Sequence, residues 1–185
     1  MDSDILQTPV PEEARRDEEQ AYLARMRHSA AHLMAGAVVD LIPEARLGIG
    51  PAIEDGFYYD FDLPNPLTPE DLARIEERMR EVQALDDPYL YKAISRDEAL
   101  EMFKDQPYKV ELIRDLPEDV QLSIYAHNGF VDLCRGPHVE STGKVRQGCQ
   151  LVRAAQHQRV DKRLGWDHCG GADVERRCLA GQQRD

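Results

Sequence analysis

The sequence predicts an α+β domain in which an antiparallel β-sheet packs against helices. Helical and strand-like segments alternate along residues 17–143, two pairs of strand-like segments are joined by turns containing Asp55-Gly56 and Asn128-Gly129, and no Gly-rich phosphate loop is present. Such hairpins favour an antiparallel sheet over a doubly wound parallel one. We expect a disordered leader at residues 1–16, the folded domain at 17–143 and a divergent tail at 144–185.

The first half of the domain reads as helix, hairpin, helix. From about Asp17 to Ile42, apolar residues recur at intervals of three and four, which is typical of an amphipathic helix, and Pro43 ends the pattern. Leu47–Asp62 is predicted to form a hairpin, because Asp-Gly separates two β-favouring runs. A second helix is expected from Thr68 to about Leu85, since Thr-Pro-Glu-Asp supplies an N-cap, a proline at the first helical position and early acids.

The second half continues with short elements. Tyr89–Ile94 is predicted to be a strand, and Ser95–Lys104 a helix opened by a Ser-x-x-Glu capping box. Pro107–Leu116 is expected to be a short helix. Val120–Ala126 and Phe130–Cys134 are predicted to form a second hairpin about His-Asn-Gly.

Composition limits the class of protein. The chain has 185 residues, of which 42% are hydrophobic, enough for one compact domain, and it has neither a long apolar run nor a secretory signal. Four cysteines are too few for a disulfide scaffold, so we expect a cytoplasmic protein. A net charge of −12 argues against a general nucleic-acid binder, although residues 144–185 carry 9 Lys and Arg against 5 Asp and Glu.

Two pairs of chemically versatile residues are each spaced four apart. His28 and His32 lie on the first expected helix and therefore share one face of it. Cys134 and His138 flank Gly136-Pro137 at the end of the last expected strand. Either pair alone is more often structural, as histidines satisfied by the core or solvent and as a buried thiol. Taken together, the four residues form a set that suits metal binding or catalysis better than either pair alone.

Three imidazoles and a thiolate suit tetrahedral Zn²⁺. The same groups can also work without metal, with a histidine as general base and Cys134 as an orienting or polarising group. Ser29 stands beside His28, where a helical zinc protease carries its glutamate, which argues against peptide hydrolysis. The residues alone leave both the zinc and the metal-free interpretation open.

Five ordered blocks between His28 and Val139 resemble the editing domain, or second additional domain, that threonyl- and alanyl-tRNA synthetases share. The blocks are HSAAHLM, GIGPAIEDGFYYDFD, LTPEDLARIEERM, YKVELI and VDLCRGPH. The GFYYDFD and DLCRGPH blocks are similar to those of the bacterial threonyl branch. Because the length leaves no room for an aminoacylation core, the resemblance implies a free-standing editing protein that cannot charge tRNA.

The resemblance implies an aminoacyl-tRNA hydrolase, in which activated water attacks the ester of tRNA(Thr) mischarged with serine. The candidate catalytic residues carried over by motif are His28, His32, Lys109, Asp132, Cys134 and His138, and Tyr59 is expected to line the substrate pocket. Lys109 would stabilise the oxyanion or hold the substrate, and Asp132 would anchor the α-ammonium or orient an imidazole. As structural residues they would instead be a solvated helix charge and a sheet-edge acid, and Tyr59 a half-buried strand aromatic.

The resemblance also implies cofactors and partners. No cofactor is required in the threonyl branch, whereas the alanyl branch is associated with Zn²⁺, here on His28, His32, Cys134 and His138. The expected partners are the 3′ aminoacyl end of tRNA(Thr) and a threonyl-tRNA synthetase, with no membrane and no DNA. The acidic chain predicts weak, salt-sensitive tRNA binding.

The sequence departs from the family after Val139, where the expected aromatic, Gly- and Arg-rich run is not recognisable. The tail carries His157, His168, Cys169 and Cys178, but their spacing matches no metal-binding pattern. Two other functions therefore stay open. One is a non-catalytic module that keeps the pocket and binds a synthetase, a tRNA end or an amino acid. The other is a zinc-dependent hydrolase of a different small ester or amide.

Overall fold

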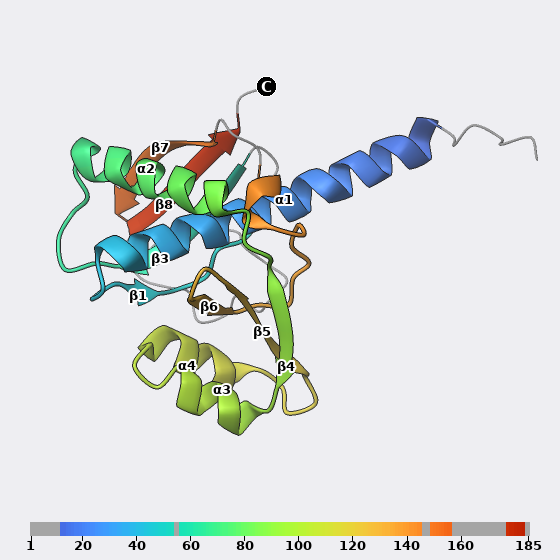
Figure 1. The fold of residues 1–185 in the computed structure, drawn as a ribbon. Coiled ribbons are helices and arrows are strands. Elements are labelled where there is room, and N and C mark those ends of the chain that lie inside the picture. The colour runs from blue at the N-terminus through green and yellow to red at the C-terminus, as the bar shows by residue number, and fades with distance from the viewer. Residues whose placement is uncertain (1–11, 54–55, 146–148, 157–176, 184–185) are drawn as a thin grey trace, which may run out of the picture.

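The computed structural model describes residues 12–53, 56–145, 149–156 and 177–183, and these form helices packed on two antiparallel sheets (Figure 1). The α+β class predicted from the sequence is confirmed. The helices are α1 (Glu12–Leu41), α2 (Pro69–Leu85), α3 (Arg96–Met102) and α4 (Pro107–Asp115), with a 3-10 turn η1 (Thr142–Lys144). The strands are β1 (Arg46–Leu47), β2 (Ala52–Ile53), β3 (Gly56–Asp62), β4 (Leu90–Ile94), β5 (Leu122–His127), β6 (Phe130–Leu133), β7 (Cys149–Gln156) and β8 (Arg177–Gln183).

The larger sheet is built around β3. Its strand order is β1-β3-β8-β7, and β2 also pairs with β3. The β2–β3 pair, with Ala52 opposite Phe57, forms the hairpin that Asp55-Gly56 predicted, although residues 54 and 55 lie outside the described residues. Alternate β3 residues, among them Phe57, Tyr59 and Phe61, are fully buried, so one face of this strand forms part of the core.

Helix α1 is the centre of the main core. It packs against both α2 and β3, and in Figure 1 its second half runs between α2 and the strands while its first half projects away from the body. From Ser29 to Val38 every side chain is buried, as expected of a helix covered on several sides. Many of these residues are alanines, and their small side chains let the neighbouring elements approach closely.

A second core lies between the smaller sheet, with strand order β4-β5-β6, and helices α3 and α4. Its buried residues are Ile94, Ala99, Phe103, Ile113, Leu122, Ile124 and Leu133. The β5–β6 hairpin turns at Asn128-Gly129, where both residues have positive φ, as predicted. The capping box predicted at Ser95 is present at the start of α3, and Thr68 caps α2 in the same way.

Two boundaries differ from the expectation. Helix α1 begins at Glu12 rather than Asp17, so the end of the expected leader is helical. The charged residues of this segment can continue a helix without being buried, and apolar periodicity does not detect such a helical turn. Strands β7 and β8 fall in the segment expected to be a divergent tail, where they pair with each other and β8 pairs with β3. The described residues include no helix both long and apolar enough to cross a membrane.

Candidate functional site

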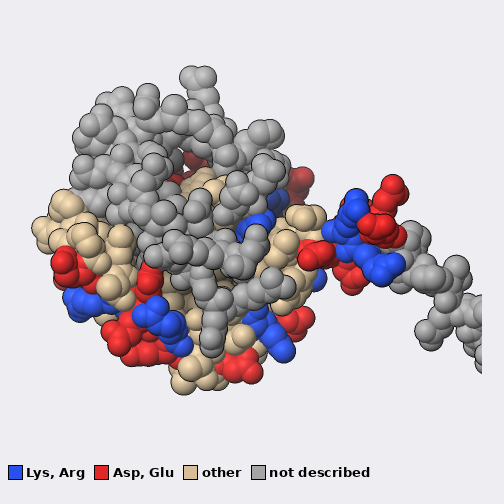
Figure 2. Space-filling model, turned by 90° about the horizontal axis from the view of Figure 1, so that it is seen from above, with Lys and Arg blue, Asp and Glu red and all other residues tan. Residues whose placement is uncertain are grey.

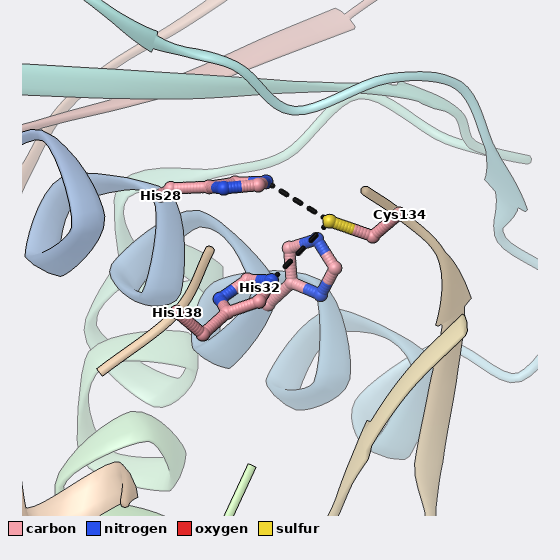
Figure 3. A group of neighbouring side chains, drawn as sticks. All are labelled: His28, His32, Cys134 and His138. Carbon is pink, nitrogen blue, oxygen red and sulfur yellow. Dashed lines mark hydrogen bonds between the residues drawn. The ribbon is translucent and has the colours of Figure 1, made fainter. Parts of the chain in front are cut away.

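Four predicted site residues meet between α1 and the end of β6. His28 and His32 extend from successive turns of α1, and Cys134 and His138 come from the segment after β6 (Figure 3). Their candidate ligand atoms all lie within 4.8 Å of one another. The Sγ atom of Cys134 is 3.3 Å from Nε2 of His28 and 3.3 Å from Nε2 of His138.

A tight turn at Gly136 brings Cys134 and His138 together. Gly136 has a φ of +71°, which L side chains rarely adopt, and its backbone N–H donates to Cys134 Sγ at 3.2 Å. A methyl group on Gly136 would lie 2.4 Å from the Tyr125 hydroxyl. Glycine is therefore required here both by backbone conformation and by the neighbouring ring.

Ser29 determines which nitrogen of His138 carries the proton. Its hydroxyl donates to the Arg25 carbonyl at 2.9 Å and accepts from the Val139 N–H at 3.0 Å. Because this single hydroxyl proton is already used, Nδ1 of His138, 3.0 Å away, must be the donor to Ser29 Oγ. In neutral His138, Nε2 is then unprotonated and faces the Cys134 thiol as an acceptor.

A buried charge pair adjoins these residues. Lys109 Nζ, on α4, lies 2.6 Å from Asp132 Oδ1, and both side chains are only 2% exposed. Asp132 Oδ1 also accepts the Leu133 N–H at 2.8 Å, whereas Oδ2 accepts the Tyr59 hydroxyl at 2.5 Å and lies 3.7 Å from Nε2 of His32. With these donors on both oxygens, Asp132 is well placed to orient its neighbours.

Burial keeps the cluster uncharged. It lowers the pKa of His138 to about 2, with a further lowering from His28, and lowers the pKa of His32 well below its usual value. The pKa of His28 is also lowered by burial, although a hydrogen bond with the Pro137 carbonyl opposes this effect. Burial raises the pKa of Cys134 to about 12. Near neutral pH, without metal, the cluster therefore holds neutral imidazoles and a neutral thiol.

The cluster opens into a cavity of about 490 Å³, whose lining includes His28, His32, Lys109, Asp132 and Cys134. This volume is in the range of small-molecule sites. Tyr59 is not part of the lining, contrary to the expectation. It is fully buried, because its ring packs on the backbone of Gly50, which does line the cavity, and its hydroxyl is bonded to Asp132.

Comparison with known proteins agrees with this architecture. Residues 122–163 match the family described as the threonyl and alanyl tRNA synthetase second additional domain. A threonine–tRNA ligase of Dehalococcoides mccartyi is 52% identical over 138 residues, and one of Paraburkholderia xenovorans is 53% identical over 140 residues. The chain belongs to the second additional domain family. The alignments cover 75% of this chain, which spans only 22–24% of the length of these ligases.

The family match reaches beyond Val139, after which the sequence was predicted to depart from the second additional domain. It extends to residue 163 and so includes β7. The segment after Val139 is therefore related to the family at least that far. His157, His168 and Cys169 lie outside the described residues, and only the backbone pairing of Cys178, in β8, is described.

The four converging residues of this second additional domain fit zinc in donor type and spacing. Tetrahedral zinc with bonds of about 2.0–2.3 Å separates its ligand atoms by roughly 3.3–3.7 Å. The two sulfur–nitrogen distances are at this spacing, and the widest pair needs to close by only about 1 Å. Nδ1 of His32 is buried without a hydrogen-bond partner among the described residues, and the Ser29–His138 bond orients a ring as outer-shell partners of metal ligands do.

Some residues that support the site gave no readable signal in the sequence. Ser29 drew attention only because it is not a glutamate, yet it orients His138. Tyr89 stacks on the His138 ring at 4.9 Å, and its hydroxyl donates to the Ser29 carbonyl. Gly50 was recognised only as part of a loop motif, although the Tyr59 ring occupies the space that a side chain at position 50 would need. All three act through contacts between distant segments, which local patterns do not reveal.

Proposed function

We propose that this chain hydrolyses the ester of tRNA(Thr) mischarged with serine. One observation carries the proposal: a buried set of neutral histidines and a thiol faces the same cavity as a lysine paired with an aspartate, in a domain related to threonine–tRNA ligases. Ester hydrolysis needs a base for water and a cation or donor for the developing oxyanion, and this cavity offers both.

His28 is the candidate general base. It lines the cavity, it is less deeply buried than His32, and its lowered pKa keeps it neutral and able to accept a proton from water near pH 7. Cys134 is a poor nucleophile in this state because its pKa is raised to about 12, which favours attack by water. Lys109 faces the developing oxyanion, and Asp132 holds Lys109 in place.

Zinc is a second way to activate water at this site. Held by His28, His32, Cys134 and His138, it would supply Lewis acidity and lower the pKa of bound water. With zinc bound, His28 would serve as a ligand instead of as the general base, whereas His138 and Asp132 keep their positioning tasks. His138 presents Nε2 to Cys134 through its bond to Ser29, and Asp132 keeps the Lys109 ammonium at the cavity.

Editing explains why such a site is useful. An aminoacylation site discriminates weakly against serine, since one missing methyl group is worth about 1–3 kcal/mol. A second cavity that accepts serine and excludes threonine removes the error. The partners we propose are the aminoacylated 3′ end of tRNA(Thr) and a threonyl-tRNA synthetase that supplies tRNA-binding surface. On the face shown in Figure 2, acidic and basic groups of the described residues are interspersed without a broad basic patch.

The test is deacylation of Ser-tRNA(Thr) beside Thr-tRNA(Thr), with and without added zinc. We expect hydrolysis of the seryl ester, with a loss of about 10²- to 10⁴-fold in His28→Gln and about 10²- to 10³-fold in Lys109→Met. Lys104→Met is the matched control, because Lys104 is an exposed lysine that forms a surface ion pair with Glu101. If folded wild-type protein binds mischarged tRNA but hydrolyses no more than His28→Gln, the chain is a binding module and the enzyme proposal fails.

A further inference from the structure

Two arginines share the cavity with the candidate catalytic residues. Arg25 and Arg135 both belong to its lining. Among the described residues, the other charged groups of the lining are Lys109 and Asp132, which form an ion pair at 2.6 Å. The two guanidinium groups thus bring two positive charges to the described lining, in a chain whose net charge is −12.

Arg25 continues the row of functional side chains along α1. Arg25, His28 and His32 are spaced so that they lie on one face of the helix, with about one turn between neighbours. Burial falls along this row, since His32 is buried and both His28 and Arg25 are partly exposed. The row thus runs from the interior of the cavity toward its opening.

The Arg25 guanidinium packs against the ring of Tyr22. Its Cζ lies 5.8 Å from the centre of the Tyr22 ring, within the range of a cation–π contact. Among the ion pairs formed by the described residues none includes Arg25, and its Nε is buried without a hydrogen-bond partner there. Ala21 and Ala24 line the cavity beside it and leave room for a ligand.

Arg135 approaches the cavity from the opposite wall, as the residue after Cys134. Its side chain is exposed, so it lies at the opening rather than in the interior. Its charge reaches the reacting groups, since it adds to the lowering of the His28 pKa by burial and partly opposes the rise of the Cys134 pKa by burial. A ligand whose ester reaches the histidines therefore passes between two cationic side chains.

We propose that Arg25 and Arg135 bind the phosphate on the 5′ side of the terminal nucleoside of the aminoacyl-tRNA. This inference rests on the proposed deacylase function and names the part of the substrate that the opening of the cavity recognises. In an aminoacylated nucleotide, the ester at the 3′ carbon and the 5′ phosphate are separated by the width of one ribose. Arg25 and His28 are three residues apart on α1, which corresponds to a rise of about 4.5 Å along the helix. Arginine suits this task because its planar group donates two parallel hydrogen bonds to phosphate oxygens.

The test compares two small esters, seryl-adenosine and the same ester carrying a 5′-phosphate, as substrates of the whole chain. We expect wild type to prefer the phosphorylated ester by about 10- to 100-fold in kcat/KM. Arg25→Gln and Arg135→Gln should each reduce this preference by about 3- to 10-fold, and Arg25→Lys by less. Arg74→Gln, on the exposed surface of α2, is the matched control and should keep the wild-type preference.

The outcomes separate this inference from the proposed function. If wild type hydrolyses both esters equally well, or if both glutamine variants keep the full preference, the phosphate site is refuted and the deacylase stands. If folded wild type hydrolyses neither ester nor Ser-tRNA(Thr), both proposals fail. With Ser-tRNA(Thr), loss of one arginine–phosphate contact should also reduce the slope of log KM against log salt concentration by about 0.7.

Discussion

The buried histidines should make the stability of the fold sensitive to mild acid, and the part of this pH dependence that is due to His138 can be calculated. Its pKa is about 2 in the folded chain, against a usual value of 6.5 that we assign to the unfolded chain. Because the folded pKa is the lower one, the unfolded chain binds the extra proton as the pH falls below 6.5. The stability that neutral His138 contributes is therefore present above pH 6.5 and is lost as the pH falls.

The magnitude follows from linkage. Between about pH 7 and pH 5, a histidine that stays neutral when folded and titrates normally when unfolded lowers the free energy of unfolding by about 2 kcal/mol. We propose to measure this by urea unfolding, followed by circular dichroism, in a metal chelator. His138→Gln lacks the titrating group, so it should lose about 2 kcal/mol less than wild type over this interval.

Comparing wild type with His138→Gln isolates the contribution of His138 to the pH dependence of stability. His28, His32 and His127, whose pKa values are also lowered by burial, titrate in both proteins and largely cancel in the difference. Lys104→Met should show the full wild-type loss, because Lys104 lies on the surface. Equal losses in wild type and His138→Gln would refute the inference that His138 is held neutral by burial.

Further predictions concern the network around Asp132 and one helix cap. Gly50→Ala places a methyl group 2.1 Å from the Tyr59 ring, so it should cost about 1–3 kcal/mol in urea unfolding and reduce deacylation; an unchanged unfolding midpoint would contradict this packing. Tyr59→Phe removes a donor from buried Asp132 and should cost about 1–3 kcal/mol in the same assay. Lys109→Met leaves the Asp132 carboxylate without its ion-pair partner and should cost about 3–5 kcal/mol in the same assay. The double variant Lys109→Met with Asp132→Leu should recover much of this stability, and no recovery would argue against a buried ion pair. Ser95→Ala breaks the α3 capping box and should cost about 1 kcal/mol in thermal unfolding without changing deacylation.

The sequence predicted those elements whose signals are local. The N-cap at Thr68, the capping box at Ser95 and the turn at Asn128-Gly129 depend on residues within a few positions of one another, and all three are present in the structure. The spacing of His28 and His32 likewise placed both on one face of α1, because helical geometry alone determines that relation.

Pairing between distant segments could not be predicted in this way. Strand β8 pairs with β3 across more than half of the chain, and its sequence, which includes Ala180-Gly181-Gln182, has little β propensity of its own. Lys109 was a candidate catalytic residue only through its motif, and without the motif it reads as a solvated helix charge, since nothing near it in sequence indicates burial beside Asp132. Tyr59 was expected in the pocket because its motif was recognised, whereas its position depends on contact with Gly50.

Asp132 connects the two halves of the fold at the site where chemistry is proposed. It lies on β6 of the smaller sheet, whereas the Tyr59 hydroxyl bonded to it comes from β3 of the larger sheet, and Lys109 comes from α4 in the second core. A buried carboxylate is tolerated only when its donors are in place, so the two sheets must adopt their correct relation before Asp132 can be buried without a large cost. The same donors fix the direction of the Lys109 ammonium at the cavity. Precision of the site and stability of the junction between the sheets therefore depend on the same three side chains, which is why substitutions here must be tested for folding and for hydrolysis together.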